Sequence, residues 1–503
     1  MEKYILVIDS GTTNVKASFI DKTSKVVCSV SSEFPVYYPE DGLTEESATV
    51  IWGTTVEMIR MLMTKSGVSE EEIHSIGITN QRETFVIWNK NTGVPVYNAI
   101  GWADRRGIPF CMKLVEEGYM GKIYQKTGMP LTSFNAVSSK AMWVLDNVPG
   151  VREQAEHGDL LLGTIETWLI WNLTQGESHV TDISNASHSM YLDINTLQWD
   201  QELLDIFRTP RSMLPELRPT SGLLGYATGI FHRNIPIMGA IGDSQSATLG
   251  HLCLEKGMIK SSYGTACLMT VNMGTEPSVV PGLLTTIGWK IGDKVSYLYE
   301  GGFYTAGLAL KWMRDTVRFI DNYETMNQRI HTVERTPGFY VCPSFLGVAT
   351  PYFSVESKGM VAGINIATNV DDIMKGVADS MAYMTRDCIE AFCDGMDAPA
   401  ICLMVDGGVT KSDDVLQFIA DINGVEVHRS SDIEATTIGA AYAAGLADGY
   451  WKDPEDIKAN LKSKTTIFKS QMDSEEVAKL YSGWKRVLQM VLDYAKPLQE
   501  GSK

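Results

Sequence analysis

The sequence of 503 residues has no stretch that approaches the roughly 18 consecutive apolar residues of a membrane-spanning helix. It also lacks room for a signal peptide, because Met1-Glu2-Lys3-Tyr4 leads directly into an apolar, strand-like segment. We therefore expect a cytoplasmic protein with no membrane partner.

Closely spaced cysteine pairs are missing as well. The eight cysteines stand at positions 28, 111, 253, 267, 342, 388, 393 and 402, far from the short spacing of a zinc site. The eight histidines form no HExxH motif. We expect reduced thiols and no zinc enzyme.

Positive charge is in short supply. Lys and Arg number 43 against 61 Asp and Glu, so the formal net charge is −18. An acidic surface repels phosphate backbones, which argues against a nucleic-acid partner. A nucleotide held by a local cation and Mg²⁺ is still compatible with this charge.

What is present is an ordinary globular balance, with 44% apolar and 21% charged residues. The chain is longer than one hydrophobic core usually serves, so two domains are expected. Helical periodicity is seen in residues 50–63, 304–319 and 370–392, and residues 436–447 form a helix rich in small side chains that suits either close approach of a ligand or tight helix packing. Because such helices alternate with apolar strands, we predict two α/β domains, residues 1–252 and 253–503.

Two similar hairpins begin the two halves. Residues 4–9 and 15–20 are apolar strands around the turn Ser10-Gly11-Thr12-Thr13. About 250 residues later, residues 258–263 and 267–271 flank Gly264-Thr265-Ala266. The repetition suggests a duplicated architecture.

The first hairpin turn has the groups that phosphoryl transfer needs. Gly11 permits close backbone approach, Thr12 and Thr13 offer hydroxyl and amide donors, and Lys16 adds a cation. Asp9, at the strand end, suits Mg²⁺ either directly or through water. The alternative is an ordinary polar turn. The sequence has no GxxxxGK[ST] motif and no strand–GxGxxG–helix unit, so the P-loop and Rossmann folds are not expected.

A second candidate site is the Arg82-Glu83 pair, which follows an apolar stretch. Arg can donate to adjacent hydroxyls and Glu can accept from them. A surface ion pair is the alternative. Trp102 could cover the carbon side of a polyol, or it could be a core residue.

A third candidate is Asp243, where an apolar strand ends and a helix begins. The N-terminus of a helix favours an ionised carboxylate, which a proton acceptor requires. An N-cap is the alternative role for this residue.

Taken together, these segments resemble the FGGY family of carbohydrate kinases, and within it the glycerol kinases most closely. The similarity extends from about residue 4 to about residue 452. It includes residues 78–84, 97–100 with Trp102, Arg105 and Arg106, 163–173, 180–182 with 185–187, 242–243, 263–265, 405–408 and 434–451.

The resemblance implies a pair of actin/hexokinase-like (ribonuclease H-like) α/β domains with an ATP cleft between them, and ATP and Mg²⁺ as cofactors. It implies that Asp243 is the base and that Asp9 and Thr12 are catalytic residues that face Mg²⁺ and the γ-phosphate. Asp9 and Asp243 would hold Mg²⁺ directly or through water, and Arg82, Glu83 and Trp102 would bind the acceptor. The nucleotide-binding positions it implies are Thr12, Thr13, Asn14, Lys16, Thr265, Gly307, Lys311, Gly408 and Ser412.

The chain departs from the glycerol kinases mainly in the acceptor pocket. Ser244 replaces a glutamine, Phe134-Asn135 stands where a tyrosine is expected, and Leu268 replaces a phenylalanine. At the nucleotide end, Lys311 and Ser412 are milder changes. Serine and leucine remove bulk, which would suit a longer acceptor.

The resulting prediction is ATP-dependent phosphorylation of a primary hydroxyl of a small polyol or sugar, with glycerol as the default acceptor. A longer polyol or ketose, such as a tetritol, xylulose or ribulose, is the alternative. A non-catalytic, ATP-binding regulator of the actin fold is a remote third reading, because it predicts loss of Arg82, Glu83 and Asp243. Family members often dimerise, so a homodimer is a candidate assembly.

Overall fold

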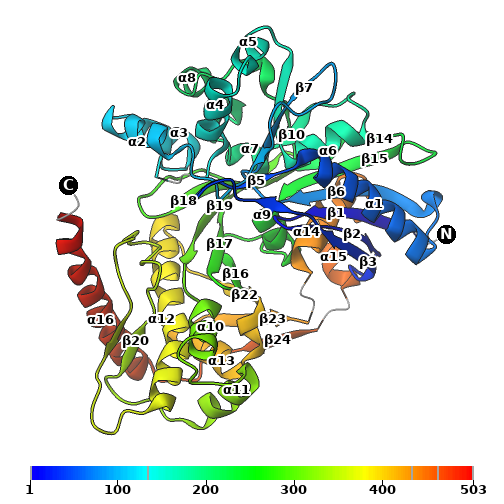
Figure 1. Ribbon diagram of the computed structural model, residues 1–503. Helices are drawn as coiled ribbons and strands as arrows, with labels where there is room; N and C mark the ends of the chain where they lie inside the picture. Colours follow the sequence, from blue (N-terminus) through cyan, green and yellow to red (C-terminus); the bar gives the residue numbers. More distant parts are fainter. Residues whose placement is uncertain (1–2, 133–134, 432–433, 462–463, 501–503) are drawn as a thin grey trace.

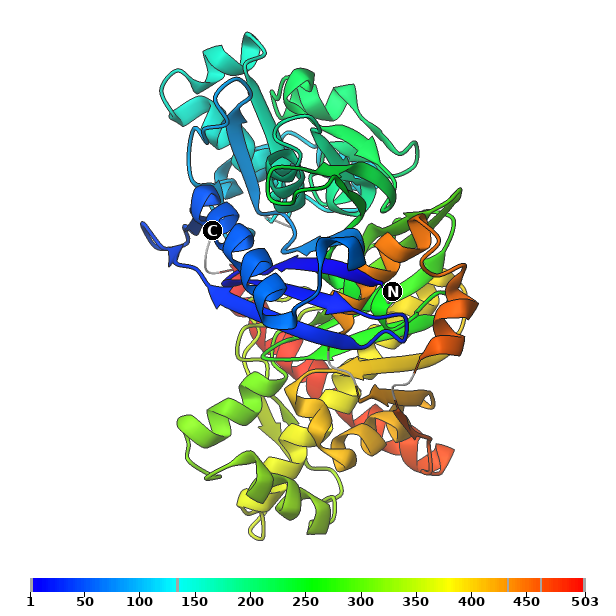
Figure 2. The same ribbon diagram turned by 90° about the vertical axis from the view of Figure 1, so that its right-hand side faces the viewer.

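The computed structural model describes residues 3–132, 135–431, 434–461 and 464–500. Figures 1 and 2 show the blue amino-terminal strands between an upper lobe of cyan and green segments and a lower lobe of green to red segments. A 13-stranded sheet runs through both lobes in the order β24-β23-β22-β16-β17-β19-β18-β14-β15-β6-β1-β2-β3. A separate five-stranded sheet, β4-β5-β8-β7-β9, is formed entirely by strands of the first half of the chain.

The elements of the first half alternate between strands and helices. They are β1 (Tyr4–Ser10), β2 (Asn14–Ile20), β3 (Val26–Glu33), β4 (Val36–Tyr37), β5 (Glu45–Glu46), α1 (Ala48–Ser66), β6 (Ile73–Asn80), β7 (Phe85–Asn89), β8 (Ala99–Ile100), α2 (Ile108–Glu116), α3 (Met120–Thr127), α4 (Val137–Asn147), α5 (Val151–Glu156), β9 (Leu160–Thr164), α6 (Ile165–Leu173), β10 (Val180–Asp182), α7 (Ile183–Ser187), β11 (Leu192–Asp193), β12 (Gln198–Trp199), α8 (Gln201–Ile206), β13 (Glu216–Arg218), β14 (Ser221–Ala227), β15 (Ile235–Gly242) and α9 (Asp243–Gly250).

The second half continues the same alternation. Its elements are β16 (Met258–Tyr263), β17 (Cys267–Gly274), β18 (Leu284–Ile291), β19 (Lys294–Phe303), α10 (Gly307–Asp315), α11 (Tyr323–Thr332), β20 (Tyr340–Cys342), β21 (Met360–Ala362), α12 (Val370–Met396), β22 (Cys402–Asp406), α13 (Asp413–Asn423), β23 (Glu426–Ser430), α14 (Ala435–Ala447), α15 (Pro454–Asn460), β24 (Thr465–Phe468) and α16 (Ser474–Glu500).

The predicted duplication is confirmed by the strand order. In the first half, β3-β2-β1-β6-β15 has antiparallel β1–β2 and β2–β3 pairs followed by parallel β1–β6 and β6–β15 pairs. In the second half, β19-β17-β16-β22-β23 repeats the same order and the same directions. The two glycine-threonine hairpins therefore occupy equivalent places. The strands β14 and β18 join the halves, through one parallel pair, Ser221 with Ile291.

Three of the four predicted helices are found close to their expected bounds, as α1, α12 and α14. The helix predicted over residues 304–319 is wrong in length, because α10 spans only Gly307–Asp315. The preceding residues are held in a turn in which Ala306 N donates to Thr265 O at 3.0 Å. At the other end, Arg318 has a positive φ of 56° and cannot continue the helix.

The small-residue helix α14 packs tightly rather than opening a ligand site. Gly439 of α14 lies so close to Ser246 O of α9 that a Cβ atom there would collide with it, and a Cβ at Gly239 of β15 would lie 2.6 Å from Ala444 N. Tight helix packing is therefore the correct alternative. It joins α14 from the second half to α9 and β15 from the first.

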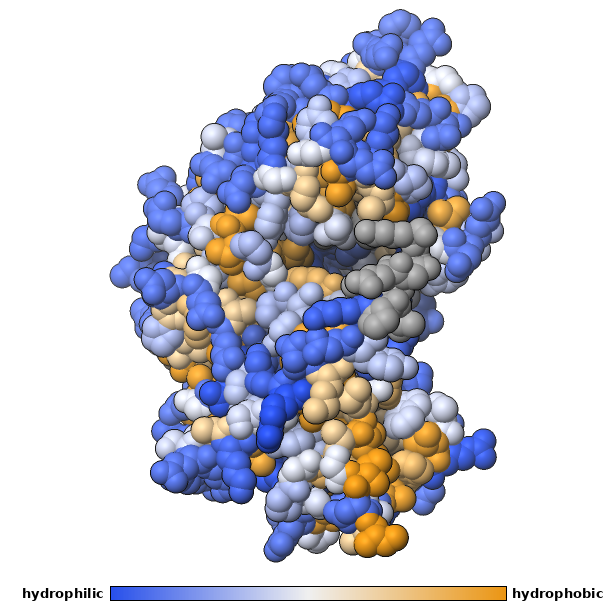
Figure 3. Space-filling model, turned by 90° about the vertical axis from the view of Figure 1, so that its left-hand side faces the viewer, coloured by the Kyte–Doolittle hydropathy of each residue, from blue (hydrophilic) through white to orange (hydrophobic). Residues whose placement is uncertain are grey.

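The predicted domain boundary falls in the connection between α9 and β16, and the division itself stays a prediction. None of the described helices combines the length and the apolar character needed to span a bilayer. Figure 3 shows that one side of the molecule is largely hydrophilic, with a hollow at mid-height between the upper and lower parts.

Candidate active site

Three parallel strands of the first half end at one edge of the sheet. Asp9 of β1 and Ile241 of β15 both pair with Thr79 of β6, so their backbones lie two strands apart, about 10 Å. Asp243 stands two residues beyond Ile241. The fold therefore brings the two predicted carboxylates to one edge, with the Arg82-Glu83 pair just past the end of the strand between them.

The first hairpin turn is tight, and it buries Ser10 while leaving its two threonines at least partly exposed. Gly11 N donates to Asn14 O at 2.9 Å, while Thr12 is half-buried and Thr13 is exposed. Trp102 Nε1 donates to Thr12 Oγ1 at 3.1 Å. This contact links the predicted apolar wall of the acceptor site to the predicted phosphate loop.

Lys16 is held by two acids. Its Nζ atom lies 3.4 Å from Asp9 Oδ2 and forms an ion pair with Glu434, which directly precedes α14. Burial raises the pKa of Asp9 above its ordinary value, although the Lys16 ammonium counters part of that effect. The predicted cation is therefore in place, and Glu434 orients it from the second half of the chain.

Asp243 is the first residue of α9 rather than its N-cap, which is Gly242. Its Oδ1 atom accepts from Ser244 N at 2.7 Å and lies 3.2 Å from Arg82 Nε. The side chain is 43% exposed, so it can still reach a bound molecule. Loss of hydration within the site raises the pKa of Asp243, and the Arg82 guanidinium works against that rise. The sequence predicted that the helix N-terminus alone would favour the ionised form of Asp243. That prediction was incomplete, because the Arg82 guanidinium is the main positive charge that stabilises the carboxylate.

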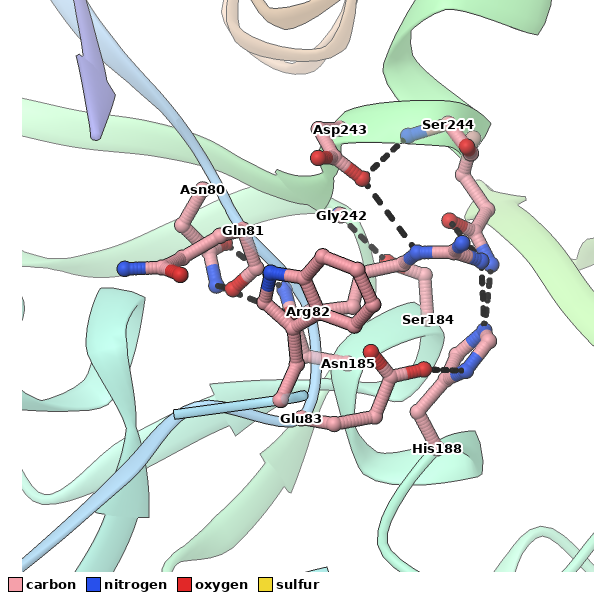
Figure 4. Close-up of polar contacts among 12 residues, drawn as sticks. Asn80, Gln81, Arg82, Glu83, Ser184, Asn185, His188, Gly242, Asp243 and Ser244 are labelled. Atoms are coloured by element: carbon pink, nitrogen blue, oxygen red, sulfur yellow. Dashed lines mark hydrogen bonds and ion pairs between the residues drawn. The ribbon is translucent and has the colours of Figure 1, made fainter. Parts of the chain in front are cut away.

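Arg82 lies at the centre of a buried polar network. Its Nη1 atom donates to Glu300 Oε1 and Oε2 at 2.7 and 2.8 Å, and the same nitrogen lies 3.1 Å from His188 Nε2. Gln245 Nε2 lies 2.8 Å from His188 Nε2 and 3.2 Å from Glu300 Oε1. Figure 4 shows Arg82 reaching between Asp243 and His188. The Arg82-Glu83 pair is therefore part of the site and not a surface ion pair.

Glu83 is held in an unusual backbone conformation. Its φ is +61°, a region in which a non-glycine residue stores strain of about 1–3 kcal/mol. His188 Nδ1 lies 2.6 Å from Glu83 Oε1. Burial raises the pKa of Glu83, but His188 and Arg82 outweigh it, so the pKa lies below its ordinary value and the carboxylate stays charged. A charged carboxylate can accept hydrogen bonds from hydroxyl groups.

Lys140 supports both acceptor loops from beneath. This fully buried lysine of α4 donates from Nζ to Gly101 O at 3.0 Å, to Trp102 O at 3.4 Å and to Glu83 O at 3.5 Å. Burial lowers the pKa of Lys140 to about 8. One side chain thus fixes the backbone at both predicted acceptor-binding segments.

Two predicted pocket residues, Ser244 and Leu268, belong to elements that contact each other. Thr248 of α9 and Thr270 of β17 are in contact, with their hydroxyl oxygens 2.6 Å apart. Ser244 lies one helical turn before Thr248, and Leu268 lies two residues before Thr270 on the same face of its strand. Asn135 is half-buried. Phe134 lies outside the described residues.

The predicted nucleotide residues gather around the second hairpin. Gly307 N and Leu308 N donate to Gly264 O and Thr265 O at 2.9 and 3.0 Å. A Cβ at Gly307 would lie 2.6 Å from Gly264 O, so only glycine fits there. Lys311 is exposed one turn further along α10.

The remaining nucleotide residues follow β22. Gly408 begins a short 3-10 turn and has no atom within 4 Å of the place that a Cβ would take. Ser412 is the residue before α13, and its buried Oγ atom has no partner within the described chain. This segment is adjacent to the Thr265 hairpin, because β22 pairs with β16.

Within the described residues, no three His, Cys, Asp or Glu side chains converge to hold a metal ion. Asp9 and Asp243 are the carboxylates at the strand edge. They fit Mg²⁺, which takes one or two protein carboxylates and completes its shell with phosphate oxygens and water.

The sequence reasoning missed Glu300, His188, Gln245, Lys140 and Glu434. A signal existed for Glu300, because it is a single charge within the otherwise uncharged strand segment 295–303. His188 directly follows the shared segment 185–187. The partners of Glu300 and His188 could not be predicted, because Arg82 and Glu83 are far from them in the sequence and leave no local pattern.

The two halves of the chain match the two domains of one protein family. Residues 4–250 match the FGGY family of carbohydrate kinases, N-terminal domain, and residues 259–447 match its C-terminal domain. Among curated sequences, a glycerol kinase of Thermoanaerobacter sp. (strain X514) is 43% identical over 500 residues, covering 99% of this chain and 100% of its own. A glycerol kinase of Bacillus subtilis (strain 168) is 42% identical and covers 98% and 100%.

Solved structures agree with this match. The glycerol kinase of Plasmodium falciparum with ADP superimposes with a TM-score of 0.93 at 30% identity and covers 98% of both chains. The gluconate kinase of Lactobacillus acidophilus gives a TM-score of 0.89 at 22% identity over 100% of both chains, a similarity of fold.

Proposed function

The chain belongs to the FGGY family of carbohydrate kinases and is an ATP-dependent kinase of a small polyol or sugar, and we propose that Asp243 activates a primary hydroxyl of its acceptor. Glycerol is the acceptor that we propose first, since glycerol kinases are similar to this chain over its whole length. The product would then be glycerol 3-phosphate.

The observation that supports this role is the contact between the predicted base and the predicted hydroxyl-binding arginine. Arg82 Nε lies 3.2 Å from Asp243 Oδ1, and Glu83 is the next residue. A polyol that bonds to the Arg82-Glu83 pair would therefore place a neighbouring hydroxyl near Asp243. Positioning of this kind supplies a large part of the rate acceleration in phosphoryl transfer.

The proposed reaction has few steps. Arg82 and Glu83 bind adjacent hydroxyls, and Trp102 covers the carbon side of the acceptor. Asp243 accepts the proton of the primary hydroxyl as its oxygen bonds to the γ-phosphorus of ATP and the bond to ADP breaks. The hydroxyls and amides of Thr12, Thr13 and Thr265, with Lys16, stabilise the phosphate oxygens.

Mg²⁺, held by Asp9 and Asp243 directly or through water, would neutralise the charge on the phosphates.

We propose the cytoplasm as the location of the protein, because its eight cysteines are unpaired and reduced thiols suit that compartment.

A longer polyol or ketose is the second candidate acceptor. Ser244 and Leu268 stand near the start of α9 and β17, two elements that touch through Thr248 and Thr270, and both are smaller than the residues expected from the resemblance to glycerol kinases. Two reductions of volume in the predicted acceptor pocket would leave room for an additional carbon unit. This supports a tetritol or pentulose over a smaller acceptor.

An acceptor panel tests the proposal. ADP release with MgATP would be measured for glycerol, erythritol, threitol, xylulose, ribulose and gluconate, and the product would be identified by phosphorus NMR. Saturable turnover with glycerol supports the first candidate, and a higher kcat/KM for a four- or five-carbon acceptor supports the second. ADP release that no acceptor accelerates would overturn both and favour a non-catalytic role.

A further inference from the structure

A buried histidine lies directly behind the Arg82-Glu83 pair. His188 follows α7, its side chain is only 1% exposed, and it contacts three different parts of the chain. These are Glu83 after β6, Glu300 of β19 and Gln245 of α9. Figure 4 shows the imidazole facing both Arg82 and Glu83.

The closest contacts of His188 Nε2 identify it as a hydrogen-bond acceptor, because two donors lie nearer to it than the Glu300 Oε1 atom, which is 3.4 Å away. Arg82 Nη1, which is always a donor, lies 3.1 Å away. Gln245 approaches at 2.8 Å with its amide nitrogen, and that orientation is fixed because the same nitrogen donates to Glu300 Oε1 at 3.2 Å. Turning the amide would place its oxygen against the Glu300 carboxylate.

His188 Nδ1 lies against a carboxylate. Glu83 Oε1, an oxygen that can only accept, is 2.6 Å away, in a close ion-pair contact that lacks the geometry of a regular hydrogen bond. Two lone pairs would repel each other at this distance, so the contact requires a proton on Nδ1. With Nε2 as the acceptor, the ring is the neutral imidazole with its proton on Nδ1.

We propose that His188 is a positioning residue for the acceptor: in its neutral, Nδ1-protonated form it fixes Glu83 Oε1 and Arg82 Nη1, so that the other Glu83 oxygen and Arg82 Nη2 face the hydroxyls. Arg82 Nη2 donates no hydrogen bond to the described residues, which leaves it for the acceptor. The inference depends on the proposed function, because it assumes that this pair binds the acceptor.

The same network makes the position sensitive to pH. The charged groups that face the ring are Arg82, Glu83 and Glu300, with Asp243 and Lys140 behind them. Burial and Arg82 lower the pKa of His188, but Glu83 and Glu300 outweigh them, so its pKa lies above the ordinary value. If Nε2 gained a proton, its N–H would point at the N–H of Arg82 Nη1, and the arginine cannot lose its own proton. The two donors would repel each other and the guanidinium would have to move. We therefore expect acceptor binding to weaken as the pH falls.

Nitrogen NMR of the intact enzyme labelled with ¹⁵N-histidine tests the ring state without measuring activity. The His188 signals would be identified as those lost in His188→Asn. At pH 8.5 to 9 we expect the Nδ1–H tautomer, with protonation of the ring as the pH falls. An Nε2–H tautomer at high pH would overturn the proposal.

Kinetics of two variants test the positioning role. His188→Leu removes the donor to Glu83 and should raise KM for the acceptor by roughly ten- to a hundredfold, with KM for ATP changed by less than about twofold. In His188→Asn the amide can replace Nδ1–H and cannot titrate. We expect partial recovery of KM and loss of the rise in KM that the wild type shows on the acid side.

The half-buried His179, whose Nε2 atom lies 3.0 Å from Leu162 O, provides the matched control. His179→Asn should leave acceptor KM and its pH dependence unchanged. An unaltered acceptor KM in His188→Leu, or an unaltered pH dependence in His188→Asn, would overturn the inference. If the wild type phosphorylates none of the acceptors, the proposed function fails, while the NMR result still decides the state of His188.

Discussion

Arg82 Nε lies 3.2 Å from Asp243 Oδ1, and this ion pair joins the loop after β6 to the first residue of α9. Because the opposite side of the guanidinium is held by Glu300 at 2.7 Å, Arg82 cannot follow Asp243 freely. The arginine thus sets both the place of the proposed base and part of its charge environment.

Asp243→Asn should abolish most turnover while leaving ATP binding intact. The amide keeps the shape of the side chain but cannot accept the hydroxyl proton, a role that contributes about 10²–10⁴-fold to rates. Steady-state ADP release measures kcat, and calorimetric titration with ATP measures binding. Asp321→Asn, on an exposed residue outside the site, is the control. Turnover of Asp243→Asn within about threefold of the wild type would contradict the role.

Ser244→Gln with Leu268→Phe should shift selectivity toward glycerol. Both residues belong to the proposed pocket, on elements that touch through Thr248 and Thr270, so the added volume would narrow that pocket. We expect the ratio of kcat/KM for glycerol to that for a tetritol to rise about tenfold or more, since one methylene is worth roughly 10–200-fold in a fitted pocket. Ser470→Gln with Leu346→Phe, both on exposed residues, should leave the ratio unchanged. An unchanged ratio in the pocket variant would show that these residues do not contact the acceptor.

Gly307→Ala should weaken ATP binding. An added Cβ atom would lie 2.6 Å from Gly264 O and would push the Thr265 hairpin away from α10. We expect KM for ATP to rise several-fold, with acceptor KM less affected. Gly53→Ala is the control, because no atom lies within 4 Å of the added carbon in α1, and it should stabilise the protein by up to about 1 kcal/mol. A Gly307→Ala enzyme with normal ATP affinity would refute the predicted steric constraint.

Glu46→Gln should stabilise the protein, and more so at pH 8 than at pH 5. Burial raises the pKa of Glu46 to about 8, so the folded state holds a proton that the unfolded chain releases above about pH 4.5. Wild-type stability therefore falls as the pH rises from 4.5 to 8, whereas glutamine does not titrate. A pKa change of one unit corresponds to about 1.4 kcal/mol, so the rise from 4.5 to about 8 predicts that the stability gain of the variant grows by roughly 3–4 kcal/mol between pH 5 and pH 8 in denaturant unfolding.

The adjacent Glu45 provides the control for this measurement. Burial raises the pKa of Glu45, but hydrogen bonds from Arg106, Asn98 and Tyr97 lower it below its ordinary value. Its contribution to stability is complete above the unfolded pKa, so Glu45→Gln should destabilise about equally at pH 6 and pH 8. A Glu46→Gln variant whose stability gain does not grow with pH would contradict the assignment.

The sequence alone determined the parts of this protein that are encoded locally. Asp9, the Gly11-Thr12 turn, Arg82-Glu83 and Asp243 each follow an apolar strand, and the carboxyl ends of neighbouring parallel strands meet at one edge of a sheet. The repeated hairpin likewise predicted the duplication, because the same strand pattern forms the same strand order.

Only the tertiary structure decided how those residues are held. Glu300 is 218 residues from Arg82, and Glu434 is 418 residues from Lys16, so no local pattern could pair them. The same is true of His188 and Lys140, which fix Glu83 and its backbone from other elements. A buried charge must find a partner wherever the fold provides one, and that choice depends on the packing of the whole molecule rather than on neighbours in the chain.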